Sequence, residues 1–114
     1  MNRVVLVVDD DCSVLETVRQ MLEELGCEVV SARGGPEALD RLRRADRIEV
    51  LITDINMPQM DGNELAHLAK RIRPQLRVLQ LSGRERRRGG YAMIRKPFSL
   101  EDLATKMEQT MGAR

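Results

Sequence analysis

The sequence has few aromatic residues and almost no excess of charge. Phe, Trp and Tyr together make up 2% of the 114 residues, so the hydrophobic core must be aliphatic. The 19 basic and 18 acidic residues leave a formal net charge of +1, which gives no general attraction to nucleic acid or to an anionic membrane. We therefore expect no direct binding to nucleic acid or membrane, and partners that are selected by a local site.

Cysteine and long apolar runs are also scarce. Cys12 and Cys27 are too few for a disulfide framework, and neither has the spacing of a Cys-x-x-Cys or Cys/His metal site. No stretch approaches the roughly 20 apolar residues of a membrane span, and the acidic residues 9–11 come too early for a secretory signal peptide. These absences predict a soluble cytoplasmic protein, and the length predicts a single domain over residues 1–114.

Short apolar runs alternate with helical patterns along the chain. Runs of Leu and β-branched residues predict five strands, at residues 4–8, 28–32, about 50–52, 77–81 and 92–95. Between and after them, apolar residues spaced three and four apart predict four helices, at about residues 14–25, 36–42, 63–72 and 100–111. Strands that alternate with helices favour a parallel sheet with helices on both faces. We predict an α/β, doubly wound, five-stranded parallel sheet.

Acidic side chains stand where two of the predicted strands end. The segment VVLVVDDD ends the first strand with Asp9, Asp10 and Asp11, and LITD ends the third strand with Asp54. In the strand order 2-1-3-4-5 these strands are neighbours, so the carboxylates converge where doubly wound sheets bind ligands. Mutual repulsion strains such a cluster unless a cation relieves it, and carboxylate oxygens suit Mg²⁺. For Asp11, a role as the cap of the following helix is an equally good interpretation.

Two further polar residues stand at the ends of predicted strands. LSG places Ser82 at the end of the fourth strand, and RKPF places Lys96 after the fifth. Alone, each has an ordinary interpretation, as a turn residue and as a solvated surface charge. Together with the acidic residues, this series of strand-end groups resembles, over nearly the whole chain, the receiver domains of bacterial two-component response regulators. The resemblance implies a flavodoxin-like receiver fold with strand order 2-1-3-4-5.

The resemblance implies a phosphoacceptor and a metal site. Asp54, in TDINMPQMDG, matches the aspartate that receives a phosphoryl group from a histidine kinase. Asp9 and Asp10 match the acidic pair that holds Mg²⁺. Asp10 and Asp54 would be direct ligands, Asp9 would act largely through water, and the main-chain carbonyl of Asn56 would complete the protein's ligands.

Ser82 and Lys96 also match residues with known roles in the family. Ser82 stands at the position of the switch Ser/Thr, and Lys96 at that of the lysine that pairs with the phosphate. The Lys96-Pro97 bond resembles the family's cis-proline turn, because peptide bonds before proline reach the cis form most easily. Phosphoryl transfer to a carboxylate depends on in-line positioning and charge neutralisation, which Mg²⁺ and Lys96 would provide.

The connection between the fourth and fifth predicted strands departs from the family. Only residues 83–93 separate Ser82 from Ile94, too few and too rich in glycine for the full helix that relatives have there. We predict that this helix is short or missing. The Arg-rich residues 84–88 predict a solvated loop, with a docking patch for an acidic partner as the alternative. Met93 stands where the family has its switch aromatic, and either Met93 or Tyr91, on the same face by strand alternation, takes that role.

Three functions are compatible with this pattern. The leading one is a Mg²⁺-dependent phosphoacceptor that is phosphorylated by a histidine kinase, or by the kinase domain of its own hybrid protein, and then switches an unknown downstream protein. Such a domain catalyses at most its own phosphorylation and dephosphorylation. A haloacid dehalogenase-like phosphatase also forms an aspartyl phosphate, but Asn56 stands where its second carboxylate would be. A receiver-like interaction module that is never phosphorylated is the third, and the complete set of site residues makes it less favoured.

Overall fold

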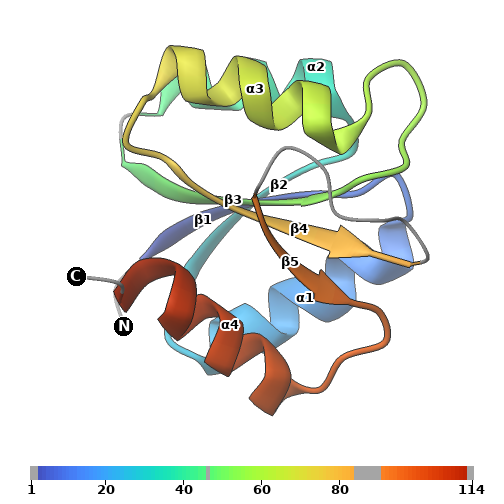
Figure 1. Cartoon of the computed structure of the whole chain (residues 1–114), viewed down its shortest axis with the longest axis vertical. Helices are drawn as coiled ribbons and strands as arrows, with labels where there is room; N and C mark the ends of the chain where they lie inside the picture. The colour runs from blue at the N-terminus through green and yellow to red at the C-terminus, as the bar shows by residue number, and fades with distance from the viewer. Residues whose placement is uncertain (1–2, 46, 84–90, 113–114) are drawn as a thin grey trace.

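Five parallel strands form the centre of the protein (Figure 1). The structure, a computed structural model, describes residues 3–45, 47–83 and 91–112. The strands are β1 (Val4–Val8), β2 (Glu28–Ala32), β3 (Ile48–Asp54), β4 (Arg77–Ser82) and β5 (Ala92–Arg95). They lie in the order β2-β1-β3-β4-β5, and every neighbouring pair is parallel. The predicted flavodoxin-like fold and strand order are confirmed.

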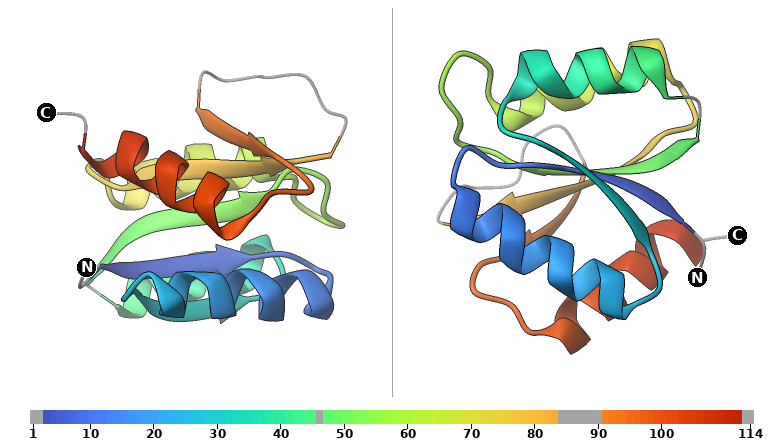
Figure 2. Two further views of the ribbon diagram at one scale, coloured as in Figure 1. Left: turned by 90° about the horizontal axis from the view of Figure 1, so that it is seen from below. Right: turned by 180° about the vertical axis from the view of Figure 1, so that it is seen from behind.

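Four helices cover the two faces of the sheet in the part of the chain that the structure describes. They are α1 (Cys12–Glu24), α2 (Gly35–Arg44), α3 (Gly62–Ile72) and α4 (Leu100–Gly112). Figures 1 and 2 show α2 and α3 on one face and α1 and α4 on the other. Each face buries an aliphatic cluster, since alternate residues of a strand point to opposite sides. None of the described helices has the length and apolar character needed to cross a membrane.

Polar caps fix where three of the helices begin. The Oδ1 atom of Asp11 accepts a hydrogen bond of 2.9 Å from the N–H of Ser13, which settles Asp11 as the N-cap of α1. Asp61 caps α3 in the same way. Before α4, Ser99 and Asp102 exchange main-chain to side-chain hydrogen bonds of 3.0 Å, a capping box with Asp in place of the usual Glu.

Some boundaries differ from those that the sequence predicted. β3 begins at Ile48, two residues before the predicted 50–52 run. The prediction began too late because Glu49 interrupts the apolar pattern, but this glutamate is only half-buried near the start of the strand and does not end it. Residues 83–91 connect β4 to β5. Most of this connection, including the Arg-rich residues 84–88, lies outside the described residues. The prediction that a helix there is short or missing concerns these same residues and stays a prediction.

Candidate functional site

Four strands end at one edge of the sheet, and a polar side chain stands at each end. Parallel strands bring their carboxyl ends together, and the register pairs Val8 with Thr53 and Ser82 with Arg95. The residues at this edge are those predicted from the sequence: Asp9 and Asp10 after β1, Asp54 at the end of β3, Ser82 at the end of β4 and Lys96 after β5. The structure therefore gathers at one edge residues that are up to 87 positions apart, from Asp9 to Lys96.

Three carboxylates lie close together in this crevice. One oxygen from each of Asp9, Asp10 and Asp54 lies within 4.8 Å of the other two. Asp9 is 1% exposed and Asp54 is 8% exposed, whereas Asp10 is open to solvent. The acidic pair after β1 thus presents one buried and one accessible carboxylate.

Lys96 brings a positive charge to the two buried aspartates. Its Nζ atom donates a hydrogen bond of 3.2 Å to Oδ1 of Asp54 and lies 3.6 Å from Oδ2 of Asp9. The peptide bond between Lys96 and Pro97 is cis, as the resemblance implied. One lysine therefore faces both buried carboxylates, so that part of their negative charge is balanced.

Burial perturbs the titration of these groups. Burial raises the pKa of Asp54 above its usual value, although the hydrogen bond and charge of Lys96 oppose this shift. Burial likewise raises the pKa of Asp9, against the hydrogen bond from the Asp11 N–H and with the charge of Asp54 adding to the effect. Burial acts to lower the pKa of Lys96, but its contacts with Asp54 and Asp9 outweigh it, so this pKa lies above the usual value. The buried carboxylates thus resist ionisation beside an ammonium that stays charged.

The carboxylate cluster has oxygen atoms that could bind a cation. Oδ1 of Asp9 accepts a hydrogen bond of 2.9 Å from the Asp11 N–H. Oδ2 of Asp9 is buried and lies 3.6 Å from Nζ of Lys96, too far for a hydrogen bond, and it accepts none from the other described residues. A buried acceptor without a donor is unfavourable, and carboxylate oxygens are preferred ligands of hard divalent ions. The residues present therefore fit Mg²⁺.

Gly62 controls the path of the loop after β3. Its N–H donates a hydrogen bond of 2.7 Å to the carbonyl of Ile55, which closes the loop of residues 56–61. A Cβ atom at position 62 would collide with the carbonyl oxygen of Asp54 and lie 2.8 Å from the Cα of Ile55. Both are main-chain atoms that cannot move aside, so only glycine fits. The sequence analysis gave Gly62 no role, although a glycine directly before a predicted helix was an available signal.

The structure also describes the other residues that the sequence analysis singled out. Ser82 is fully buried, and its carbonyl accepts a hydrogen bond of 2.7 Å from the N–H of Lys96. Asn56 is exposed in the loop after β3, where the ligation of a metal by its carbonyl stays a prediction. Tyr91 packs against the aliphatic cluster on the α2 and α3 face, and Met93 is half-buried in β5. Which of these two acts as the switch residue also stays a prediction.

Comparison with known proteins finds relatives along nearly the whole chain. Residues 5–108 match the response regulator receiver domain family. The response regulator MprA of Mycobacterium avium (strain 104) is 35% identical, over 90% of this chain and 48% of that protein. The same protein from Mycobacterium tuberculosis (strain ATCC 25618 / H37Rv) matches at the same identity and coverage. The chain spans about half the length of the curated relatives it matches.

Solved structures share the fold as well. The chemotaxis protein CheY4 of Vibrio cholerae superposes with a TM-score of 0.89 at 29% identity, over 97% of this chain and 100% of that chain. The receiver domain of the hybrid histidine kinase CckA superposes with a TM-score of 0.84 at 31% identity, over 95% of this chain and 98% of that chain. The family match runs from the first strand into the last helix, and the protein therefore belongs to the response regulator receiver domains of two-component signalling.

Proposed function

We propose that this receiver domain is a phosphoacceptor and that Asp54 receives the phosphoryl group. The observation that carries the proposal is the position of Asp54 at the end of the central strand, beside two other carboxylates and 3.2 Å from the ammonium of Lys96. A carboxylate is a weak nucleophile, so phosphoryl transfer to it depends on positioning and on neutralisation of charge. The neighbours of Asp54 are suited to supply both.

Mg²⁺ is the proposed cofactor. Asp10 and Asp54 would bind the ion directly, Asp9 would act largely through water, and the main-chain carbonyl of Asn56 would add a fourth contact. The closeness of the three carboxylates and the unsatisfied Oδ2 of Asp9 support this assignment. When bound, Mg²⁺ supplies neutralisation of the charge on the phosphoryl oxygens and on the aspartates.

Lys96 and Ser82 would respond to the new phosphoryl group. In this step a bond forms between a carboxylate oxygen of Asp54 and phosphorus, while the bond from phosphorus to the nitrogen of a phosphohistidine breaks. Lys96 already contacts Asp54, so its ammonium would need only a small movement to pair with a phosphoryl oxygen. The Ser82 hydroxyl would donate a hydrogen bond to a second phosphoryl oxygen. The added charge of about −1 would thus draw β4 and β5 residues toward Asp54.

The partners follow from this chemistry. A histidine kinase would donate the phosphoryl group, either as a separate protein, as the similarity to the response regulator MprA suggests, or as the kinase part of the same hybrid protein, as the similarity to the CckA receiver domain suggests. The phosphorylated domain would then bind an unknown downstream protein. We further propose that residues 1–114 form one receiver domain, that it works in the cytoplasm, and that it catalyses only its own phosphorylation and dephosphorylation.

Acetyl phosphate provides a direct test because it needs no kinase. Incubation of the protein with acetyl phosphate and Mg²⁺ is expected to add one phosphoryl group by intact mass, stable in acid and removed by base or hydroxylamine. Asp54→Asn should remain unmodified. Asp61→Asn is the matched control, since it makes the same Asp-to-Asn change in the exposed loop that follows β3, and Asn also caps a helix well; it should be modified as the wild type is.

The other functions predict different results. Equal modification of Asp54→Asn and the wild type would overturn the assignment of the phosphoacceptor. Continuous hydrolysis of a phosphate ester would indicate a phosphatase. A folded wild type that accepts no phosphoryl group, from acetyl phosphate or in a screen of histidine kinases, would indicate an interaction module.

A further inference from the structure

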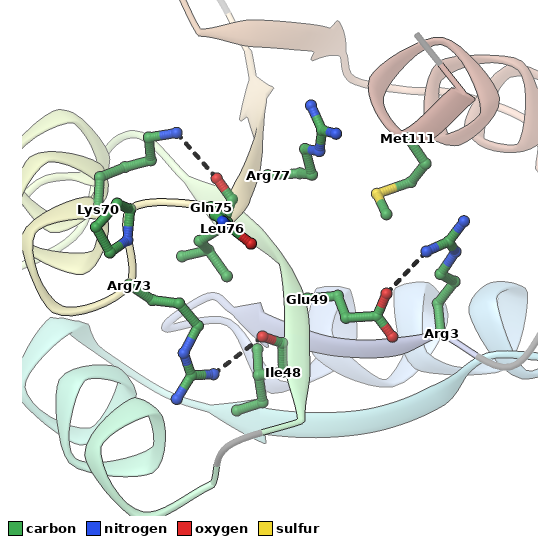
Figure 3. Close-up of a pocket in the computed structure, with 10 residues that line it drawn as sticks. Arg3, Ile48, Glu49, Lys70, Arg73, Gln75, Leu76, Arg77 and Met111 are labelled. Carbon is green, nitrogen blue, oxygen red and sulfur yellow. Dashed lines mark hydrogen bonds and ion pairs between the residues drawn. The ribbon is translucent and has the colours of Figure 1, made fainter. Parts of the chain in front are cut away.

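A second cleft lies at the opposite end of the sheet from Asp54. It forms where β3 and β4 begin, between the last turns of α3 and α4, and Figure 3 shows its lining side chains. Its volume is about 690 Å³. Clefts that bind ligands in proteins commonly measure about 300–1,000 Å³. The cleft lies where β3 begins and Asp54 lies where β3 ends, so the length of the strand separates this cleft from the phosphoacceptor site.

The charged lining of this cleft is mostly positive. The cationic lining residues are Arg3, Lys70, Arg73 and Arg77. Glu49 is the sole carboxylate among the lining residues that the structure describes. Because the whole chain has a net charge of only +1, this excess of positive charge is a local feature. Charges that surround a concave surface reinforce one another, so the cleft favours an anionic ligand.

Two of the cations are held in place by main-chain oxygens. Arg73 donates hydrogen bonds of 3.0 Å to the carbonyl of Ile48 and 2.9 Å to that of Leu42. Lys70 donates one of 3.1 Å to the carbonyl of Leu76. Carbonyl oxygens orient these groups but do not neutralise them. A guanidinium has five N–H donors and an ammonium has three, so both side chains keep donors for a ligand.

The other two cations are available at the rim. Arg3 pairs with Glu49 at 2.8 Å, with side chains 37% and 39% exposed. Exposed pairs of this kind are weak, so a ligand carboxylate could replace Glu49 at little cost. Arg77 is exposed at the start of β4 and makes no ion pair within the described ranges. Figure 3 shows Lys70 and Arg73 on one side of the cleft and Arg3 on the other.

We propose that this cleft binds an acidic segment of a partner protein through its carboxylates. Arginine forks match the two oxygens of a carboxylate, which favours aspartate and glutamate side chains. Leu76 and Met111 add apolar lining that the stems and apolar residues of a peptide can contact. No aromatic side chain is among the described lining residues, so the stacking platform that a nucleotide base would use is lacking there. A partner bound here leaves Asp54 accessible.

A pair of labelled peptides tests this proposal in the intact domain. The probes are a fluorescent peptide of Glu and Leu and a peptide of equal length in which Lys replaces Glu, and the measurement is fluorescence anisotropy. We expect the acidic peptide to bind, with an affinity that falls as salt rises, and the basic peptide not to bind. In amide NMR spectra, the acidic peptide should shift the signals of residues 48–49 and 75–77 and leave those of residues 54–57 and 59–62 unchanged.

Variants distinguish a specific cleft from a general attraction. Arg77→Glu should weaken acidic peptide binding at least about tenfold, because it reverses an unpaired charge at the rim. Arg43→Glu is the matched control, since Arg43 is also exposed and makes no ion pair among the residues that the structure describes; it should weaken binding less than about twofold. Both variants should melt close to the wild type, because neither position is buried.

The opposite results would overturn the proposal. Equal losses from the two variants would show a general attraction to a basic surface. Displacement of the peptide by millimolar ATP or inorganic phosphate, with amide shifts at residues 75–77, would assign the cleft to phosphorylated small molecules. Binding by Asp54→Asn should equal binding by the wild type, so failure here is separable from failure of the phosphoacceptor proposal.

Discussion

The two ends of the sheet collect charges of opposite sign, and they do so at different depths. At the carboxyl end, buried aspartates surround one lysine; at the amino end, partly exposed basic residues surround one glutamate. The direction of the helices accounts for the signs. In a parallel αβ fold, helices begin at the carboxyl end and finish at the amino end of the strands. Asp11 and Asp61 accordingly cap α1 and α3, and Lys70 lies in the last turn of α3, as the helix dipole favours.

The difference in burial between the two ends indicates which end suits a chemical reaction and which suits the binding of a partner. Asp9 directly follows the buried strand β1 and Asp54 is the last residue of the buried strand β3, so their charges are poorly solvated and a bound ion or phosphoryl group strongly changes the local charge balance. The basic side chains come from helix ends and strand starts and are partly or fully exposed, so their contacts with charged groups are weaker and more easily exchanged. Changes at the carboxyl end should therefore have large effects, and changes at the amino end small ones.

The largest effect on stability should come from Gly62→Ala. The new methyl group would collide with main-chain atoms of Asp54 and Ile55, so the loop after β3 must move or the protein must lose stability. We expect a loss of about 2–4 kcal/mol in the free energy of unfolding, measured by urea denaturation. Gly34→Ala is the control, because a Cβ there meets only the Cδ of Pro36 at 3.9 Å, and it should cost less than about 1 kcal/mol. Equal losses would show that the close approach at Gly62 is unimportant.

Substitutions of two neighbouring aspartates, Asp10 and Asp11, should have different effects on Mg²⁺ affinity. Asp10→Asn removes a carboxylate of the cluster and should lower Mg²⁺ affinity at least about tenfold by calorimetric titration, a loss of about 1.4 kcal/mol. Asp11→Asn makes the same change one residue later, where the side chain only caps α1, and should leave the affinity unchanged. A comparable loss of Mg²⁺ affinity in both variants would contradict the assignment of Asp10 as the direct ligand.

The burial of the carboxylates should appear as a dependence of stability on pH. The folded pKa of Asp54 is raised, so the folded protein favours the protonated group, and this stabilisation is present at low pH and lost as pH rises through the folded pKa. Without metal, Asp54→Asn should therefore melt a few degrees above the wild type at neutral pH, the shift that about 1 kcal/mol produces in a domain of this size. The difference should shrink on acidification. A variant that melts below the wild type at neutral pH would show that the ion pair with Lys96 outweighs burial.

The sequence predicted the placement of the site residues correctly where the sheet topology alone brings them close together. Asp9, Asp54, Ser82 and Lys96 each follow or end a recognisable strand, and a parallel sheet brings such residues to one edge whatever their separation in the chain. The sequence did not indicate the role of Gly62, which depends on how closely a loop returns to β3. The basic cleft was also missed, because its charges come from separate helix ends and strand starts, and each resembles an ordinary solvated residue.

The smallest effect should come from Glu49→Gln at the amino end. This change removes one exposed ion pair with Arg3, so the free energy of unfolding should fall by less than about 1 kcal/mol. The same change removes the carboxylate that competes for Arg3 and should strengthen binding of the acidic peptide about two- to threefold, as measured by anisotropy. Glu101→Gln, an exposed change in the first turn of α4 and outside the cleft lining, is the matched control and should leave peptide affinity unchanged. If Glu49→Gln instead weakens the peptide complex, then Glu49 holds Arg3 in its binding position, and the amino end is as preorganised as the phosphoacceptor site.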